Sequence, residues 1–83
     1  MEIEKGKIIA FQGSWSSGLA TLLIETEEGV QSVLCDNGPT ARALISAFNC
    51  LGPGHTIDNS KLEGQEISFS VDFLGLLEGF SPI

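Results

Sequence analysis

In the middle of this 83-residue chain the hydrophobic pattern takes on a helical period, and this change constrains the fold more than any other feature. In the middle of the chain apolar residues recur at steps of three and four, as they do along one face of an α-helix. These residues are Ala41, Leu44, Ile45, Phe48 and Leu51. Pro39 suits a first helical turn, and Gly52 with Pro53 favours a stop. The spacing predicts an amphipathic helix over 39–51.

The chain before this helix has the composition of β-strands. Residues 3–11 are rich in β-forming side chains, and Gly6 within them indicates a bulge or bend. Residues 19–26 alternate, which predicts a strand with one buried face. That face carries Ala20, Leu22 and Ile24. Glu27, Glu28 and Gly29 then favour a tight turn into a returning strand over 29–35.

The chain after the helix is predicted to contain a loop, a strand and an apolar end. Residues 52–64 have no apolar period, so we expect a loop. Residues 65–73 alternate as a half-buried antiparallel strand does. Its core face is predicted to carry Ile67, Phe69, Val71 and Phe73. Residues 73–83 are apolar but broken by Gly75, Gly79 and Pro82, and they fit either a bent fifth strand or an exposed interaction segment.

The predicted order is three strands, a helix and two strands. This is the order of the OB-fold, a small five-stranded Greek-key barrel, in which the helix would cover one open end. We therefore predict a mainly β, OB-type barrel as a single domain over 1–83, a length that suits one core. An SH3-like barrel and an open α+β sheet are the alternatives.

Three segments resemble the cold-shock type of OB domain: residues 6–12, 18–22 and 62–69. The resemblance implies the fold and, for that family, nucleic-acid binding through aromatic residues that stack on bases. Here Leu19 and Thr21 occupy the positions of the second-strand aromatics, and the third strand has none. The resemblance therefore supports the fold but not the family's activity. A second likeness, to small molybdate-binding OB domains, covers only residues 36–40, where Asp36 would repel the anion.

The charge balance argues against several partners. Eleven acidic residues and four Lys or Arg give a net charge of −7. Nucleic-acid backbones are bound through clustered cations, so this composition disfavours nucleic acid and anionic membranes. The carboxylates form either a solvated surface or a face for a basic partner. No apolar stretch is long enough to span a bilayer, and the charged first residues are unlike a signal peptide, so we expect a cytoplasmic protein.

Residue types that bind metals or catalyse reactions are present without a recognised spacing. Cys35, Cys50, His55 and Asp58 match no standard zinc pattern. Nothing in the sequence indicates that Cys35, His55 and Asp58 meet as a catalytic set. We therefore predict no metal, no cofactor and no enzymatic activity. The two cysteines are interpreted as buried thiols in preference to a disulfide.

The candidate binding residues lie at two predicted loops. Trp15, in the glycine- and serine-rich loop 13–18, either anchors a partner or folds back over the barrel mouth. Phe73, Leu74 and Leu76 are expected at the loop between the last two strands, which flanks the binding face of OB-folds. Because apolar residues over 74–80 cannot all face inward from one strand, we expect some of them to be exposed.

We therefore predict a binding module that contacts another protein, or a second copy of itself, through residues 13–18 and 73–80. Two alternatives remain. One is single-stranded nucleic-acid binding on the face of the second and third strands. The other is a small-ligand or anion site at the 36–40 turn, where Asn37, Gly38 and Thr40 offer backbone amides and a hydroxyl.

Overall fold

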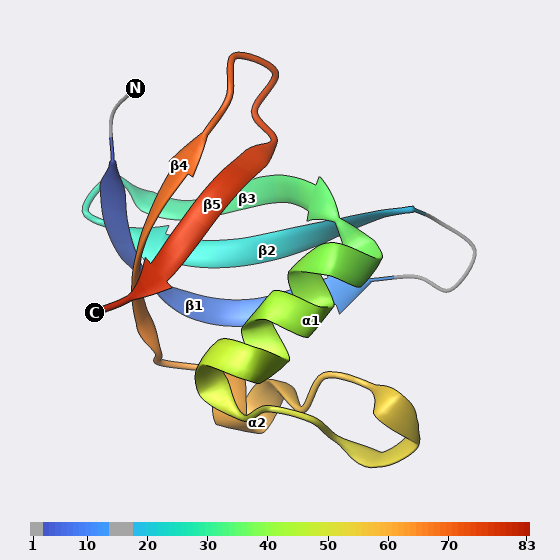
Figure 1. Cartoon of the computed structure of the whole chain (residues 1–83). Helices are drawn as coiled ribbons and strands as arrows, with labels where there is room; N and C mark the ends of the chain where they lie inside the picture. Colours follow the sequence, from blue (N-terminus) through green and yellow to red (C-terminus); the bar gives the residue numbers. More distant parts are fainter. Residues whose placement is uncertain (1–2, 14–17) are drawn as a thin grey trace.

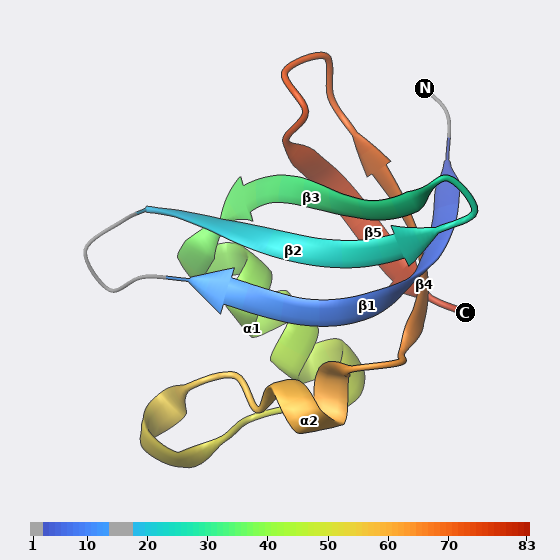
Figure 2. The ribbon, with the colours of Figure 1, turned by 180° about the vertical axis from the view of Figure 1, so that it is seen from behind.

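The computed structural model describes residues 3–13 and 18–83 of the chain. Five antiparallel strands form one sheet in the order β3-β2-β1-β4-β5. The strands are β1 (Glu4–Gly13), β2 (Leu19–Thr26), β3 (Gly29–Asp36), β4 (Glu66–Val71) and β5 (Leu77–Pro82). The main helix, α1 (Asn37–Phe48), lies on one side of the curved sheet, with β1, β2 and β3 behind it (Figures 1 and 2).

The core lies between the curved sheet and α1. Alternation along β2 buries the predicted face, and Leu44 is the fully buried residue of α1. The buried hydrophobic residues are Ile8, Phe11, Ala20, Leu22, Ile24, Val33, Cys35, Leu44, Cys50, Leu62, Ile67 and Phe69. The predictions for the β2–β3 hairpin and for Ile67 and Phe69 are confirmed.

The sheet is not closed by a continuous ladder. Among the described residues no ladder pairs β3 with β5, and an isolated parallel bridge joins Leu34 of β3 to Leu76, the residue before β5. The mainly β architecture with one main helix is therefore established, and a closed barrel stays a prediction.

The helix is shorter at its end than the apolar pattern predicts. It begins at Asn37, after Asp36 as N-cap, and not at Pro39. It ends at Phe48 because Asn49 adopts the left-handed conformation (φ 53°, ψ 48°), and the Asn49 N–H donates to the Ile45 carbonyl at 2.8 Å. Leu51 continues the period but lies outside the helix, with 46% of its surface exposed. A left-handed residue ends a helix whatever the apolar spacing beyond it.

The prediction of a plain loop over 52–64 is wrong. A 3₁₀ turn (Pro53–His55) and a one-turn helix, α2 (Asn59–Leu62), lie within it. Leu62 is fully buried and anchors α2 to the core. One helical turn with one buried side chain is too short to produce a detectable period.

The prediction that Phe73 lies on the core face is also wrong. The register of β4 and β5 shifts between Ser70 and Val71, and β4 ends at Val71. Phe73 follows in a turn and is 94% exposed. Alternation cannot predict this, because a bulge breaks the two-residue period.

Gly6 permits a close approach of strands and is not the bulge of β1. The register with β2 shifts between Ile8 and Ala10. At Gly6, β1 pairs with β4, and a Cβ atom there would lie 2.5 Å from Ile24 Cγ2 and 2.7 Å from the Glu25 carbonyl oxygen. Any other residue would therefore force β1 and β2 apart.

No helix within residues 3–13 and 18–83 combines the length and apolar content needed to cross a membrane.

Candidate functional site

The turn between β4 and β5 is held in one conformation by Asp72. The Asp72 carboxylate accepts hydrogen bonds from the N–H groups of Leu74 (2.8 Å) and Leu76 (3.0 Å). The Asp72 backbone N–H donates to the Leu76 carbonyl at 2.8 Å, and Gly75 supplies the positive φ (83°) that the turn requires. Because one side chain satisfies two backbone donors, the turn is ordered before any partner binds.

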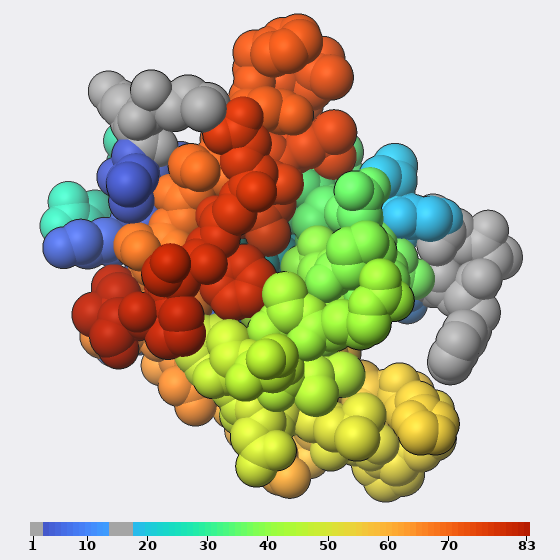
Figure 3. Space-filling view, in the orientation of Figure 1, coloured from blue at the N-terminus to red at the C-terminus, as the bar shows by residue number. Residues whose placement is uncertain are grey.

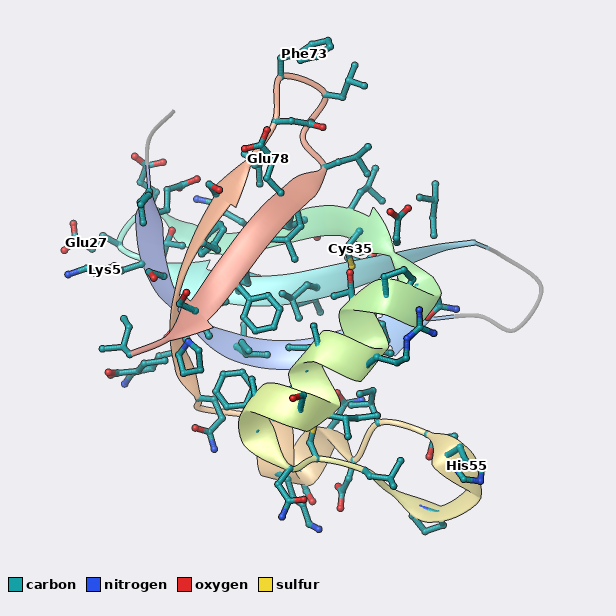
Figure 4. The ribbon with its side chains drawn as sticks, in the orientation of Figure 1. Lys5, Glu27, Cys35, His55, Phe73 and Glu78 are labelled. Carbon is teal, nitrogen blue, oxygen red and sulfur yellow. The ribbon has the colours of Figure 1, made fainter. Side chains whose placement is uncertain are left out.

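This turn carries Phe73, which at 94% is the most exposed large apolar side chain of the described residues, and beside it Leu74 at 66%. Phe73 stands at the tip and points away from the body (Figure 4), and the turn projects as an orange knob in the space-filling view (Figure 3). Leu77 and Phe80 instead pack against the core, and Phe80 stacks on Phe48 with 6.3 Å between ring centroids. The segment 73–83 thus contains both a fifth strand and an exposed apolar tip.

The outer face of β2 and β3 carries partly exposed aliphatic side chains. Leu19 and Leu34 are 47% and 45% exposed, and Thr21 pairs with Leu34 across the two strands. The bridge from Leu34 to Leu76 brings this face to the base of the turn. Neither β2 nor β3 contains an aromatic residue.

The predicted anion residues are divided between two grooves on either side of α1. Asn37 and Gly38 line one groove, whereas Thr40 lines the other. The Thr40 side chain also hydrogen-bonds the Cys35 thiol. The structure therefore does not bring Asn37, Gly38 and Thr40 together into one site.

The groove that Thr40 lines is called the β5 groove. It lies between α1 and β5 and has a volume of about 510 Å³. Its helix side is made of small residues such as Ala43 and Ala47, and its strand side includes Leu77 and Phe80. The carboxylates of Asp36 and Glu78 also line it, so its charge is negative.

The groove that Asn37 and Gly38 line is called the loop groove. It lies between α1 and the 51–57 segment and has a volume of about 540 Å³. Its apolar lining comes from Phe11, Ala41, Ile45, Leu51 and Ile57. Its charged and titratable lining consists of Arg42 and His55, and no described Asp or Glu lines it.

The wall of the loop groove is built by an internally bonded segment. The Gly52 N–H donates to the Thr56 carbonyl and the Asp58 N–H donates to the Cys50 carbonyl, both at 2.7 Å. The Thr56 hydroxyl donates to the Pro53 carbonyl at 2.7 Å. These bonds fix the shape of the segment.

Asn59 fastens this segment to the sheet. Its side-chain oxygen accepts from the Phe11 N–H (2.8 Å), and its side-chain nitrogen donates to the Phe11 carbonyl (3.2 Å). The Asn59 side chain thereby makes the two backbone hydrogen bonds that a neighbouring strand would otherwise make with Phe11 of β1. The sequence analysis missed Asn59, although Asp58 before it is a common N-cap residue and could have indicated α2.

The metal-binding and nucleophilic residue types do not form a cluster. Cys35 is buried in β3, whereas His55 lies on the exposed 52–58 segment, far from it in Figure 4. Asp58 caps α2 by accepting from the Ser60 N–H (3.0 Å) and hydroxyl (2.6 Å). Within the described ranges, no group of three such residues is placed to hold a metal ion.

Both cysteines are free and buried, as interpreted from the sequence. Burial is the main cause that raises the pKa of the Cys35 thiol, and the hydrogen bond with Thr40 only partly opposes it. Burial also raises the pKa of Cys50. A thiol with a raised pKa is a poor nucleophile, so neither cysteine has the properties of a catalytic residue.

Trp15 lies outside the described residues, and its two interpretations stay predictions. Comparisons with protein-family models, curated proteins and solved structures give no match for this chain. The functional conclusion therefore depends on the exposed turn, the aliphatic face and the two grooves.

Proposed function

We propose that this chain is a non-enzymatic, OB-type module that binds another protein through the 72–76 turn and the adjoining outer face of β2 and β3. The strand order and the parallel bridge between Leu34 and Leu76 support the OB-type assignment, because the third and fifth strands are neighbours in that barrel.

The exposed Phe73 on its fixed turn carries this proposal. A phenylalanine left in water forgoes about 1.5–3 kcal/mol of burial free energy, which becomes available when a partner covers it. Asp72 has already fixed the backbone on both sides of Phe73, so binding costs little additional conformational entropy. A protruding aromatic anchor fits an apolar socket on the partner.

The charge indicates the surroundings of that socket. Asp72 stands beside Phe73, Glu78 follows in β5, and the whole chain carries −7. Basic residues around the partner's socket would match this charge and speed the encounter. We therefore propose a protein partner with an apolar pocket and a basic rim.

Site-specific photo-crosslinking in cells of the source organism tests the proposal. A photoreactive phenylalanine analogue at position 73 is expected to give a discrete adduct with one protein. The same analogue at Ile83, which is also exposed (68%) but lies beyond the opposite end of β5 from the turn, is the matched control and should not give it. Leu74→Ser should weaken the adduct at position 73, because loss of a central apolar contact costs roughly 2 kcal/mol or more at an interface hot spot.

Sedimentation of the purified protein separates a heterologous partner from self-association. An adduct of twice the chain mass, together with a dimer that Phe73→Ser dissociates, would assign the turn to a homodimer. A monomer whose crosslinks at position 73 match those at position 83 would overturn the proposal.

A further inference from the structure

The loop groove has a composition that the rest of the molecule does not share. The chain holds eleven acidic residues against four Lys or Arg and one His. Nevertheless Arg42 and His55 both line this groove, and no described carboxylate does. Arg42 is thus a cation at a concave surface that no described carboxylate lines, and a local positive charge of this kind attracts anions.

Much of the remaining lining is apolar, beside the polar residues Asn37 and Thr56. Ile45 and Ala41 contribute from α1, Leu51 and Ile57 from the facing segment, and Phe11 from β1. Leu51 is 46% exposed, so its side chain is available to a ligand. The volume of about 540 Å³ lies within the range of small-molecule sites, roughly 300–1,000 Å³.

The groove is also shaped in advance. Its outer wall is closed by the bridge between Leu51 and Ile57, and Asn59 fastens the end of that segment to Phe11. Arg42 forms no ion pair with any carboxylate among residues 3–13 and 18–83, so its guanidinium is available for a ligand anion. A guanidinium binds a carboxylate with two parallel hydrogen bonds when the geometry allows it.

We propose that the loop groove binds a small monocarboxylate with an apolar body, with the carboxylate at Arg42 and the hydrocarbon against Ile45, Leu51 and Ile57. His55 lies on the opposite wall and adds a hydrogen-bond donor. This site is separate from the 72–76 turn: the 51–57 segment lies at the bottom of the molecule in Figure 1, and the turn projects at the top.

A titration followed by amide chemical shifts tests the site directly. Octanoate is the probe, octylammonium has the same chain with the opposite charge, and acetate has the charge without the chain. Octanoate is expected to shift the amides of Ala41, Ile45, Leu51 and Ile57 with saturation, and the other two compounds are not. Octylammonium that shifts the same amides as strongly, or octanoate shifts located elsewhere, would overturn the proposal.

Two variants assign the charge. Arg42→Gln should weaken octanoate binding roughly two- to fivefold, the size of a solvent-accessible ion pair. Lys61→Gln removes the same charge from α2, outside the groove, and should leave the binding constant unchanged. Equal effects of the two variants would mean that only net charge matters and would refute a site at Arg42.

A third variant tests the space. Ala41→Phe places a ring in the groove and should abolish the octanoate shifts while circular dichroism shows an unchanged fold. Retained binding in a folded Ala41→Phe protein would contradict the proposal, and if that variant does not fold, the comparison of Arg42→Gln with Lys61→Gln decides the question.

Discussion

The two sides of α1 carry grooves of nearly equal size and opposite charge. The β5 groove measures about 510 Å³ and is lined by Asp36 and Glu78, whereas the loop groove measures about 540 Å³ and is lined by Arg42 and His55. Small side chains along α1, such as Ala41 on one side and Ala43 on the other, leave space on both flanks. One helix therefore separates two electrostatic environments, and the net charge of −7 describes neither of them.

The two grooves also differ in how their walls are held. On the β5 side, Phe48 and Phe80 stack with an interplanar angle of 12°. On the loop side, polar bonds from Asn59 to Phe11 hold the wall. Apolar stacking and amide hydrogen bonds respond differently to substitution, so each side can be weakened separately.

Leu44→Ala should disturb both sides and have the largest effect. Leu44 is fully buried and fixes α1 over the sheet between the two grooves. Its truncation leaves a cavity and should lower the free energy of unfolding by about 2–5 kcal/mol. Urea unfolding followed by circular dichroism measures the loss, and Ser46→Ala, at an exposed position of the same helix, is the control. A loss no larger than that of the control would mean that α1 does not depend on the core.

Asn59→Ala should weaken only the loop side, by about 1–3 kcal/mol, because it leaves the partly buried N–H and carbonyl of Phe11 without partners. Hydrogen exchange is expected to accelerate at Phe11 and over 50–58 but not at the β4–β5 pair. Gln65→Ala removes an exposed side-chain bond to the Lys61 carbonyl and serves as the control. Uniform acceleration across the sheet would contradict a local clamp.

The sequence was informative about those parts of the fold that depend on local patterns. Strand β2, its hairpin with β3 and the burial of Ile67 and Phe69 follow from two-residue alternation, which is a local property. The end of α1 could not be read from the pattern, because the left-handed Asn49 ends the helix while the apolar period continues to Leu51.

The candidate sites depend on contacts between distant segments. Asn59 and Phe11 are 48 residues apart, and no local pattern records that they meet. Likewise, the sequence grouped Asn37, Gly38 and Thr40 because they are adjacent in the chain, but a helical start turns neighbours to different sides. Phe73 and Leu74, two of the binding residues that the sequence predicts, are exposed, although the alternation also predicts Phe73 on the core face. Their role in binding stays a prediction.

The stacked pair on the β5 side should give a smaller, separable effect. Phe80→Leu and Phe48→Leu each keep apolar volume but lose the ring contact, which is worth about 0.5–1.5 kcal/mol beyond area burial. A double-mutant cycle from urea unfolding isolates this coupling. Octanoate shifts in the loop groove should be unchanged in both variants. A coupling near zero would show that the two rings contribute only by their buried area.

The smallest expected effect concerns Asp58, whose cap supports the wall of the loop groove. The hydrogen bond from the Ser60 hydroxyl is the main cause that lowers the pKa of Asp58 below its ordinary 3.8. A carboxyl whose pKa is lowered by folding contributes stability above its unfolded pKa, and this contribution is lost as the pH falls through the folded value. The free energy of unfolding of Asp58→Asn should therefore differ from that of the wild type at neutral pH and converge with it below about pH 4.

Ser60→Ala should raise the pKa of Asp58 in a carboxyl-detected NMR titration, whereas Ser32→Ala, at an exposed position of β3, should not. An Asp58 titration that does not respond to Ser60→Ala would show that the hydroxyl does not hold this carboxylate, and the wall would then depend on its backbone bonds and on Asn59.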